Sequence, residues 1–218
     1  MQLLANTTSP YVRIARVSMI EKGLNVEPTI VDPWADDPRL RKANAATRVP
    51  TLITDDGVPL TESLLIVQWL EHLRPAPEWP SLLGHDVSDV PGVLSRAGIA
   101  LGVIDAAVHT IIIRKVTAPV LFDDTPVGLR RRRTMAEGMA RLESAAARGQ
   151  LTGDSNSNSN GGAYGARTPT LDAICAVVAL DYLRFRFDGQ PWLPDMPALD
   201  TLSASLGQRA SFAQTLPR

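Results

Sequence analysis

Three short segments in the first third of the chain have residue types that could hold a small anionic thiol peptide. They are Ser9-Pro10-Tyr11-Val12-Arg13, Arg48-Val49-Pro50-Thr51 and Thr61-Glu62-Ser63. A hydroxyl stands where a helix would begin, a proline follows a β-branched residue before a strand, and an acid and a hydroxyl open a second helix. Each segment alone is common in proteins, but their order predicts a thiol-binding site.

The Ser9 hydroxyl is the group that could act on a thiol. It precedes an expected helix N-terminus, where the helix dipole favours negative charge. An ordinary thiol has a pKa near ~8.5, and lowering it by two units takes about 2.7 kcal/mol. One charge-assisted hydrogen bond and the helix dipole together are of that size. The alternative is that Ser9 only caps the helix, which is the commoner role of serine there.

The other two segments have the chemistry to bind the backbone and the charged end of a peptide. A trans Val49–Pro50 bond is the ordinary expectation, but a cis bond would turn the N–H and C=O of Val49 toward an extended ligand. Glu62 can accept from an α-ammonium group, while Ser63 and the helix N-terminus hold an α-carboxylate. The alternative is a plain helix cap with Thr61 as N-cap.

The elements that would position these groups form one α/β domain in residues 1–75. The pattern predicts the order βαβ-α-ββ-α, with Asp55-Asp56-Gly57 as a hairpin turn. The expected strands are 2–5, 26–31, 51–54 and 58–60, and the expected helices are 10–23, 36–44 and a third beginning at Glu62.

The rest of the chain is expected to be helical. Prolines punctuate residues 76–91, which indicates a linker. An all-α domain is predicted for 92–218, with a flexible loop at 153–166 because its Ser, Asn and Gly residues cannot bury apolar area. The expected helices are 92–120, 126–148, 170–187 and 198–206. The fold class is therefore α/β plus all-α, a thioredoxin-like domain with a helical bundle.

Composition excludes several classes of protein. The 22 basic and 23 acidic residues give a net charge of −1, which argues against nucleic-acid binding. The run Arg130-Arg131-Arg132-Arg133 is expected to be a solvated helix face, with an anion or partner contact as the alternative. No apolar run approaches the ~20 residues of a membrane span. A single cysteine, Cys175, is consistent with a reducing, cytoplasmic setting.

These segments together resemble the glutathione transferase superfamily. The likeness lies in Ser9–Arg13, Glu21-Lys22-Gly23-Leu24, Val31-Asp32-Pro33-Trp34, Arg48–Leu52 and Glu62-Ser63, and it continues in 179–186 and Arg209-Ala210-Ser211-Phe212. It implies a thioredoxin-like domain with an all-α domain, a homodimer, and detoxification chemistry with glutathione as co-substrate and no metal.

The resemblance also implies roles for individual residues. Ser9 would activate the thiol, and glutathione would be bound by Arg48, Val49, Pro50, Glu62 and Ser63. Asp105 resembles an acid that reaches the site of a neighbouring subunit. A hydrophobic electrophile would lie between the domains, near Tyr11, His109, Ile113 and Arg114.

Two positions depart from the family pattern. Residues Asn44 to Arg48 lack the Pro and Gly that members have before Val-Pro, which puts the glycyl end of the site in question. In the late helix Asp172 stands one position early for a capping box, although Thr170 is still expected to cap.

The serine separates the possible reactions. Disulfide exchange requires a protein thiolate where Ser9 stands, and Cys175 is expected to be a buried packing thiol. Conjugation of glutathione to an electrophile is therefore predicted rather than thiol transfer. The alternatives are a non-catalytic scaffold or regulatory module, and a specialised glutathione-dependent isomerase or dehalogenase.

Overall fold

A computed structural model describes residues 1–117, 122–151 and 168–217. The chain divides into two compact units, of which the first comprises Met1–Leu82 with Gly207–Arg218 and the second Leu83–Leu206. The predicted loop at 153–166 lies outside the described residues.

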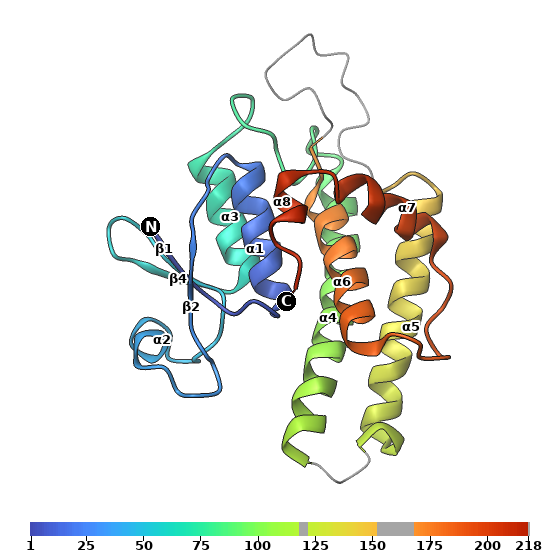
Figure 1. The fold of residues 1–218 in the computed structure, drawn as a ribbon. Coiled ribbons are helices and arrows are strands. Elements are labelled where there is room, and N and C mark those ends of the chain that lie inside the picture. Colours follow the sequence, from blue (N-terminus) through green and yellow to red (C-terminus); the bar gives the residue numbers. More distant parts are fainter. Residues whose placement is uncertain (118–121, 152–167, 218) are drawn as a thin grey trace. The chain divides into compact units, whose positions relative to one another are not determined.

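The first unit is built on a four-stranded sheet with the order β2-β1-β3-β4 (Figure 1). β1 pairs in parallel with β2 and antiparallel with β3, which pairs antiparallel with β4. Prolines begin both edge strands, where the missing N–H costs no ladder bond. The elements are β1 (Gln2–Ala5), α1 (Pro10–Glu21), β2 (Pro28–Ile30), α2 (Pro38–Ala43), β3 (Thr51–Ile53), β4 (Pro59–Thr61) and α3 (Ser63–Leu73).

Alternating side chains of the strands divide the core of this unit into two layers. Leu3 and Leu52 face α1 and α3 and pack with Val12, Ile66 and other apolar residues. Leu4, on the other face, packs with Val31 and with Leu40 of α2. This period of two is what a sheet covered by helices on both faces requires. The thioredoxin-like fold class predicted for the first domain is confirmed.

The C-terminal end of α1 is fixed by a buried lysine. Lys22 is fully buried, and its ammonium group lies 2.7 Å from Glu71 and donates to the Arg74 carbonyl at 2.9 Å. It therefore joins the ends of α1 and α3. Gly23 follows with φ +70°, and a Cβ there would lie 2.2 Å from the Trp79 ring. The glycine predicted to end this helix is thus required by both conformation and space.

The short helix α8 (Ala210–Ala213) belongs to the first unit and packs on α1 (Figure 1). Sequence analysis placed these residues in the helical domain. The structure assigns them differently because Glu21 at the end of α1 binds Arg209 and Ser211. Phe212 is buried as well. These contacts join residues that are far apart in sequence, so no local pattern predicted them.

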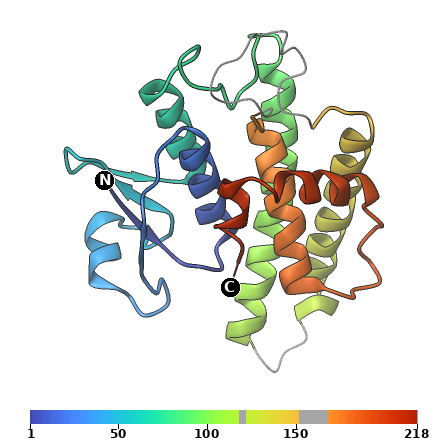
Figure 2. The same cartoon turned by 45° about the horizontal axis from the view of Figure 1, so that its top comes forward.

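The second unit is helical, as predicted. α4 packs against both α5 and α6, and α7 packs against α5 and α6 (Figure 2). Gly138 permits the close approach of α5 to α4, since a Cβ there would lie 2.4 Å from the Val103 side chain. The elements are α4 (Val90–Thr117), the 3₁₀ turn η1 (Phe122–Asp124), α5 (Pro126–Ala147), α6 (Leu171–Phe187) and α7 (Pro197–Leu206).

The N-terminus of α6 is capped by an aspartate rather than by its N-cap threonine. Thr170 makes no capping bond with its side chain, so that expectation was wrong. Its hydroxyl instead donates to Asp172 at 2.5 Å, and the same carboxylate accepts from the Ala173 amide at 3.0 Å. Arg96 of α4 lies 2.6 Å from the other oxygen of Asp172. Both carboxylate oxygens of Asp172 therefore have partners, although the residue stands one position early for a capping box.

By length and composition alone, α4 is apolar enough to cross a membrane. The prediction that no apolar run approaches the length of a membrane span does not hold for α4. The buried residues of α4 include Ala97, Val103 and Ala107, and the helix packs against α5 and α6. Long apolar helices in the core of a bundle have a similar length and composition.

Candidate functional site

The sheet brings the three sequence segments to one edge. Leu4 pairs with Thr51, and Thr51 pairs with Thr61. Both registers can be continued beyond the ends of the strands. Val49, two residues before β3, then lies opposite the end of β1 on one side and the start of α3 on the other. Three segments therefore lie next to one another at this edge of the sheet: the loop that leads to Ser9, the Val49-Pro50 dipeptide, and Glu62-Ser63.

Ser9 is the N-cap of α1, with Pro10 in the first turn. Its hydroxyl oxygen accepts from the Val12 amide at 3.3 Å. This is the capping role that sequence analysis gave as the alternative. Capping uses a lone pair of the oxygen, however, and the hydroxyl proton remains available as a donor. The cap and a hydrogen bond to a thiolate are therefore compatible in one side chain.

The Val49–Pro50 peptide bond is cis. The trans bond expected from the sequence was therefore wrong, and the alternative of a cis Val49–Pro50 bond is confirmed. Within the described residues, neither the amide nor the carbonyl of Val49 makes a backbone hydrogen bond. Both groups are thus open to an extended ligand that would pair with the chain as an added strand does.

Asn44 shapes the loop before Val49, and sequence reasoning missed its role. Its side-chain amide donates to the Arg48 carbonyl at 3.0 Å and to the Thr51 hydroxyl at 3.1 Å. Its oxygen accepts from the Ala46 amide at 2.9 Å. The side chain is buried, so these bonds hold the loop in place of the Pro and Gly that family members have there. The Asn at the end of an expected helix was the available signal.

Glu62 precedes α3 in an unusual backbone conformation. It is the N-cap, with φ +66°, and its side chain makes no capping bond. Thr61, which the alternative proposed as N-cap, lies in β4. A non-glycine residue at positive φ is sparsely populated, and such residues gather at functional sites. The Glu62 carboxylate is more than half exposed and lies 3.1 Å from Arg48, which joins two of the predicted binding residues. Ser63 is buried.

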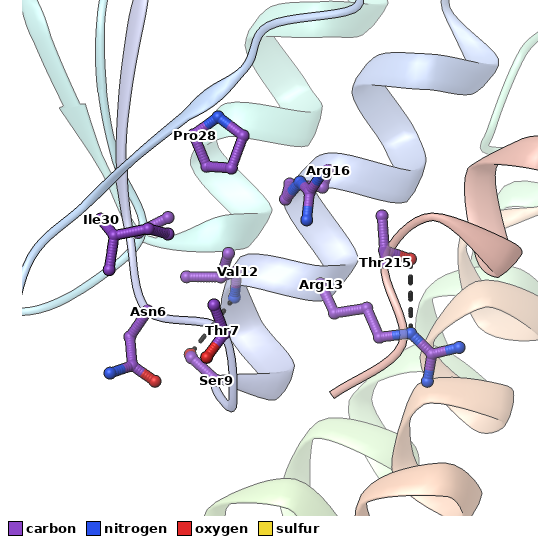
Figure 3. A pocket seen from close by; sticks show the side chains of 10 residues that line it. Asn6, Thr7, Ser9, Val12, Arg13, Arg16, Pro28, Ile30 and Thr215 are labelled. Atoms are coloured by element: carbon purple, nitrogen blue, oxygen red, sulfur yellow. Dashed lines mark hydrogen bonds between the residues drawn. The ribbon is translucent and has the colours of Figure 1, made fainter. Parts of the chain in front are cut away.

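A small cavity lies beside Ser9 in the first unit (Figure 3). Arg13 is buried, and its Nε donates to the Thr215 hydroxyl at 3.4 Å, while its guanidinium group lies 5.9 Å from the centre of the Phe212 ring. The C-terminal segment therefore forms part of the wall. The cavity is lined by Ala5, Asn6, Thr7, Ser9, Val12, Arg13, Arg16, Pro28, Ile30 and Thr215.

The helical unit holds most of the residues that sequence analysis assigned to the electrophile and to a partner subunit. Asp105 and His109 are exposed on α4, and Ile113 is half-buried. Arg114 forms a bidentate ion pair with Asp123 and lies 5.0 Å from the Phe187 ring centre. Arg114 therefore also anchors η1. Tyr11, the remaining residue of this group, is half-buried on α1 of the first unit.

The arginine run on α5 is only partly solvated. Arg130 and Arg133 are exposed, as expected for a solvated face. Arg131 and Arg132 are half-buried. Arg131 lies 3.3 Å from Nδ1 of His109, and Arg132 donates to the Asp123 carbonyl at 3.5 Å. Two of the four arginines thus hold α5 to α4 and η1.

Cys175 is fully buried in α6. Burial raises the pKa of its thiol far above the ordinary value, and the Asp172 carboxylate adds to the effect. A thiol in this state is neither nucleophilic nor a metal ligand. Within residues 1–117, 122–151 and 168–217, no group of three or more His, Cys, Asp or Glu is placed to bind a metal ion.

The first unit thus has a thioredoxin-like fold whose edge presents a hydroxyl, an open backbone segment and an acid before a helix. Residues 3–78 match the family described as "Glutathione S-transferase, N-terminal domain". A glutathione S-transferase from Methylobacterium radiotolerans, solved with glutathione sulfonate, is 30% identical with a TM-score of 0.79, covering 99% of this chain and 94% of its own. The chain belongs to the glutathione transferase superfamily.

Two further relatives span the whole chain. A glutathione S-transferase from Methylobacillus flagellatus, solved with glutathione bound, is 26% identical with a TM-score of 0.78, covering 100% of this chain and 99% of its own. The protein of Escherichia coli K12 described as "Uncharacterized GST-like protein YibF" is 28% identical over 217 residues, which are 100% of this chain and 98% of that protein. Both similarities cover the two units together.

Proposed function

We propose that this protein is a glutathione transferase that stabilises the thiolate of glutathione for attack on a small electrophile. The observation that carries the proposal is the state of Ser9. Its oxygen caps α1, and its proton remains to be donated. The N-terminal end of α1 adds positive potential at the same place.

The remaining binding groups follow the shape of the tripeptide. The open amide and carbonyl of Val49 pair with the cysteinyl backbone, while Pro50 fixes the turn of the chain. Glu62 accepts from the γ-glutamyl ammonium group, and Ser63 with the N-terminus of α3 binds its carboxylate. Arg48, which pairs with Glu62, supplies positive charge for the glycyl carboxylate. The residue types support these roles, and the resemblance supplies their assignment.

The reaction is a substitution or an addition at carbon. The thiol proton passes to solvent and the sulfur forms a bond to the electrophilic carbon. In a substitution the leaving group departs with its electron pair, and in an addition the electron pair of the broken π bond takes up a proton from solvent. No covalent intermediate with the protein forms, and the protein contributes proximity and thiolate stabilisation. Thiol transfer does not fit, since Ser9 has no thiol and Cys175 is buried with a raised pKa.

The biological setting remains part of the proposal. A cytoplasmic detoxification enzyme that acts on a hydrophobic electrophile and forms a homodimer is what the family resemblance implies. Leu64 and Leu65 of α3 are exposed, which offers apolar surface to a second copy. Tyr11, His109, Ile113 and Arg114 stay predictions for the electrophile, as Asp105 does for a role across a dimer interface.

Calorimetric titration with reduced glutathione tests the first step. Binding with a Kd between micromolar and low millimolar values is the expected outcome. The matched titrant is oxidised glutathione, which has no free thiol and should bind more weakly. Conjugation of an activated chloronitroarene, followed by absorbance, then tests for catalysis. Absence of heat at two temperatures would leave the non-catalytic scaffold as the better account. Reaction with only one type of electrophile, whether or not a conjugate accumulates, would indicate a specialised isomerase or dehalogenase.

A further inference from the structure

The Arg48–Glu62 ion pair joins two of the segments that are proposed to bind glutathione. Nη1 of Arg48 donates to Oε1 of Glu62 at 3.1 Å, and both side chains are more than half exposed. Arg48 stands directly before Val49, and Glu62 stands directly before Ser63. The two charges that the proposed function assigns to opposite ends of the ligand are therefore bound to each other in the free protein.

Hydrogen bonds of the main chain hold both ends of this ion pair in place. The Arg48 carbonyl accepts from the Asn44 side chain at 3.0 Å and from the Thr51 hydroxyl at 2.9 Å. The Glu62 carbonyl accepts from the Ile66 amide at 3.1 Å at the start of α3. Because β3 pairs with β4, the sheet also fixes the separation of the two segments. Only the two exposed side chains must move when the ion pair opens.

The bond between the two side chains is single, which leaves a place for a second cation. In the part of the chain that the structure describes, the side chains of Arg48 and Glu62 make no hydrogen bond or ion pair except this one. Oε2 of Glu62 can therefore accept from an incoming ammonium group. Two cations on one carboxylate repel each other, so the arrival of the ammonium group weakens the hold of Glu62 on Arg48.

The strength of the ion pair also suits an exchange of partners. An exposed ion pair changes an equilibrium by about fivefold or less, because water and salt screen its charges. The Lys22–Glu71 pair of the same unit differs, since Lys22 is fully buried and opening that pair would leave an unpaired charge in the core. Arginine has a long and flexible side chain, so the guanidinium group of Arg48 can turn to another partner once it is released.

We propose that glutathione binds by exchange with this ion pair: its ammonium group replaces Arg48 on Glu62, and its glycyl carboxylate replaces Glu62 on Arg48. The inference rests on the proposed function and adds a rule of specificity to it. A ligand with both charged ends replaces the broken ion pair with two new ones. A ligand without the glycyl carboxylate leaves Arg48 unpaired, so the ion pair selects against it.

Two ligands that differ only at the glycyl end test the exchange. Reduced glutathione has the glycyl carboxylate, whereas glutathione monoethyl ester has an uncharged ester there and keeps the ammonium group and the thiol. In calorimetry, we expect wild-type protein to bind glutathione more tightly than the ester. Arg48→Met should bind the ester about threefold more tightly than wild-type protein does, because no ion pair has to be opened at Glu62. The same variant should not gain affinity for glutathione, because it has also lost the partner of the glycyl carboxylate.

Arg41→Met is the matched control for the loss of a paired arginine. Arg41 forms a similarly exposed ion pair with Asp36 at 2.8 Å, and neither residue is assigned to the ligand. This variant should bind both ligands as wild-type protein does. Arg48→Lys keeps a cation and should retain part of the preference for glutathione over the ester. Thermal unfolding establishes that each variant is folded.

The ester distinguishes failure of the exchange from failure of the proposed function. If Arg48→Met binds the ester no more tightly than wild-type protein, while wild-type protein binds glutathione, the exchange is overturned and the proposed function stands. Equal gains in Arg48→Met and Arg41→Met would also overturn the exchange, because they would report a general effect of net charge. If neither ligand binds wild-type protein, the proposed function fails first and the exchange fails with it.

Discussion

Arg209 and Glu21 stand 188 residues apart in the sequence and form a bidentate ion pair. Nε of Arg209 lies 2.8 Å from Oε1 of Glu21, and Nη2 lies 2.6 Å from Oε2. The Ser211 hydroxyl donates to the same carboxylate. Glu21 is the last residue of α1, where the helix dipole disfavours negative charge. A buried carboxylate at the C-terminal end of a helix therefore needs a cation nearby. The hydrogen bond from Arg209 to Glu21 raises the pKa of Arg209.

Removing the cation should therefore destabilise the first unit strongly. Arg209→Leu leaves the nearly buried Glu21 carboxylate without its charge partner, and we expect a loss of about 3 kcal/mol in the free energy of unfolding by urea. Arg41→Leu, which breaks the exposed pair with Asp36, should leave the unfolding midpoint nearly unchanged. Adding Glu21→Gln to Arg209→Leu should restore part of the loss, and a larger loss in the double variant would contradict this account.

The two roles of Ser9 can be separated by comparing caps. Ser9→Ala removes the cap of α1 and should cost about 1 kcal/mol of stability. It should also raise the pKa of bound glutathione, measured by thiolate absorbance against pH. Thr125→Ala removes an equivalent cap on α5, where the Gly128 amide donates to Thr125 at 3.0 Å.

The threonine variant should lose stability without changing the thiol pKa. Ser9→Asp gives the converse result, because an aspartate caps well but has no proton to donate and repels a thiolate. Normal stability with poor thiolate formation is therefore expected for Ser9→Asp. An unchanged thiol pKa in both Ser9 variants would remove Ser9 from the mechanism.

Glu62 should show opposite effects on stability and on binding. Glu62→Gly relieves the cost of φ +66°, so its unfolding free energy should equal or exceed that of wild-type protein. It also removes the carboxylate, and affinity for glutathione should fall by about tenfold or more. Glu62→Gln keeps the side-chain length and the strain, and should lose affinity without gaining stability. Equal affinity in all three proteins would exclude contact between Glu62 and the ligand.

The helical unit should lose part of its stability in acid through Asp123. The Arg114 side chain donates to Asp123 and lowers the pKa of that carboxyl below its ordinary 3.8, while burial opposes the shift and the charges of Arg114 and Arg132 add to the lowering. A lowered folded-state pKa stabilises the protein above pH 3.8, and this contribution is lost as the pH falls through the folded-state value. The stability difference between wild-type protein and Asp123→Asn should therefore be constant from pH 7 to 5 and shrink below pH 4 in urea titrations. A difference that grows in acid would contradict the assignment.

Local patterns account for the elements of the fold that sequence analysis predicted. Asp55-Asp56-Gly57 predicted a hairpin, and the Gly57 amide does bond to the Thr54 carbonyl with Gly57 at φ +79° between β3 and β4. The order βαβ-α-ββ-α and the four long helices also follow from period and turn residues. Each of these signals depends on neighbours within a few positions, and such signals are readable from one sequence.

The parts of the site that escaped prediction depend on tertiary contacts. The cis bond at Val49–Pro50 and the positive φ of Glu62 have no sequence signature, because few residues in any chain adopt either state. The network of Asn44 requires Thr51 and Arg48 to come within reach in the folded chain. The place of Thr215 in the wall of the Ser9 cavity depends on α8 returning to α1.

The return of α8 to α1 makes the first unit discontinuous in the sequence, since its final segment follows the entire helical unit. During synthesis, α1 leaves the ribosome long before Arg209, Phe212 and Thr215 exist. The Glu21 carboxylate, which is buried in the finished fold, therefore stays solvated and without Arg209 while roughly 190 further residues are synthesised. This takes about 10–40 s at ordinary rates of translation. The thioredoxin-like unit thus cannot reach its final packing vectorially, and a ribosome stalled before residue 207 would carry an unfinished domain.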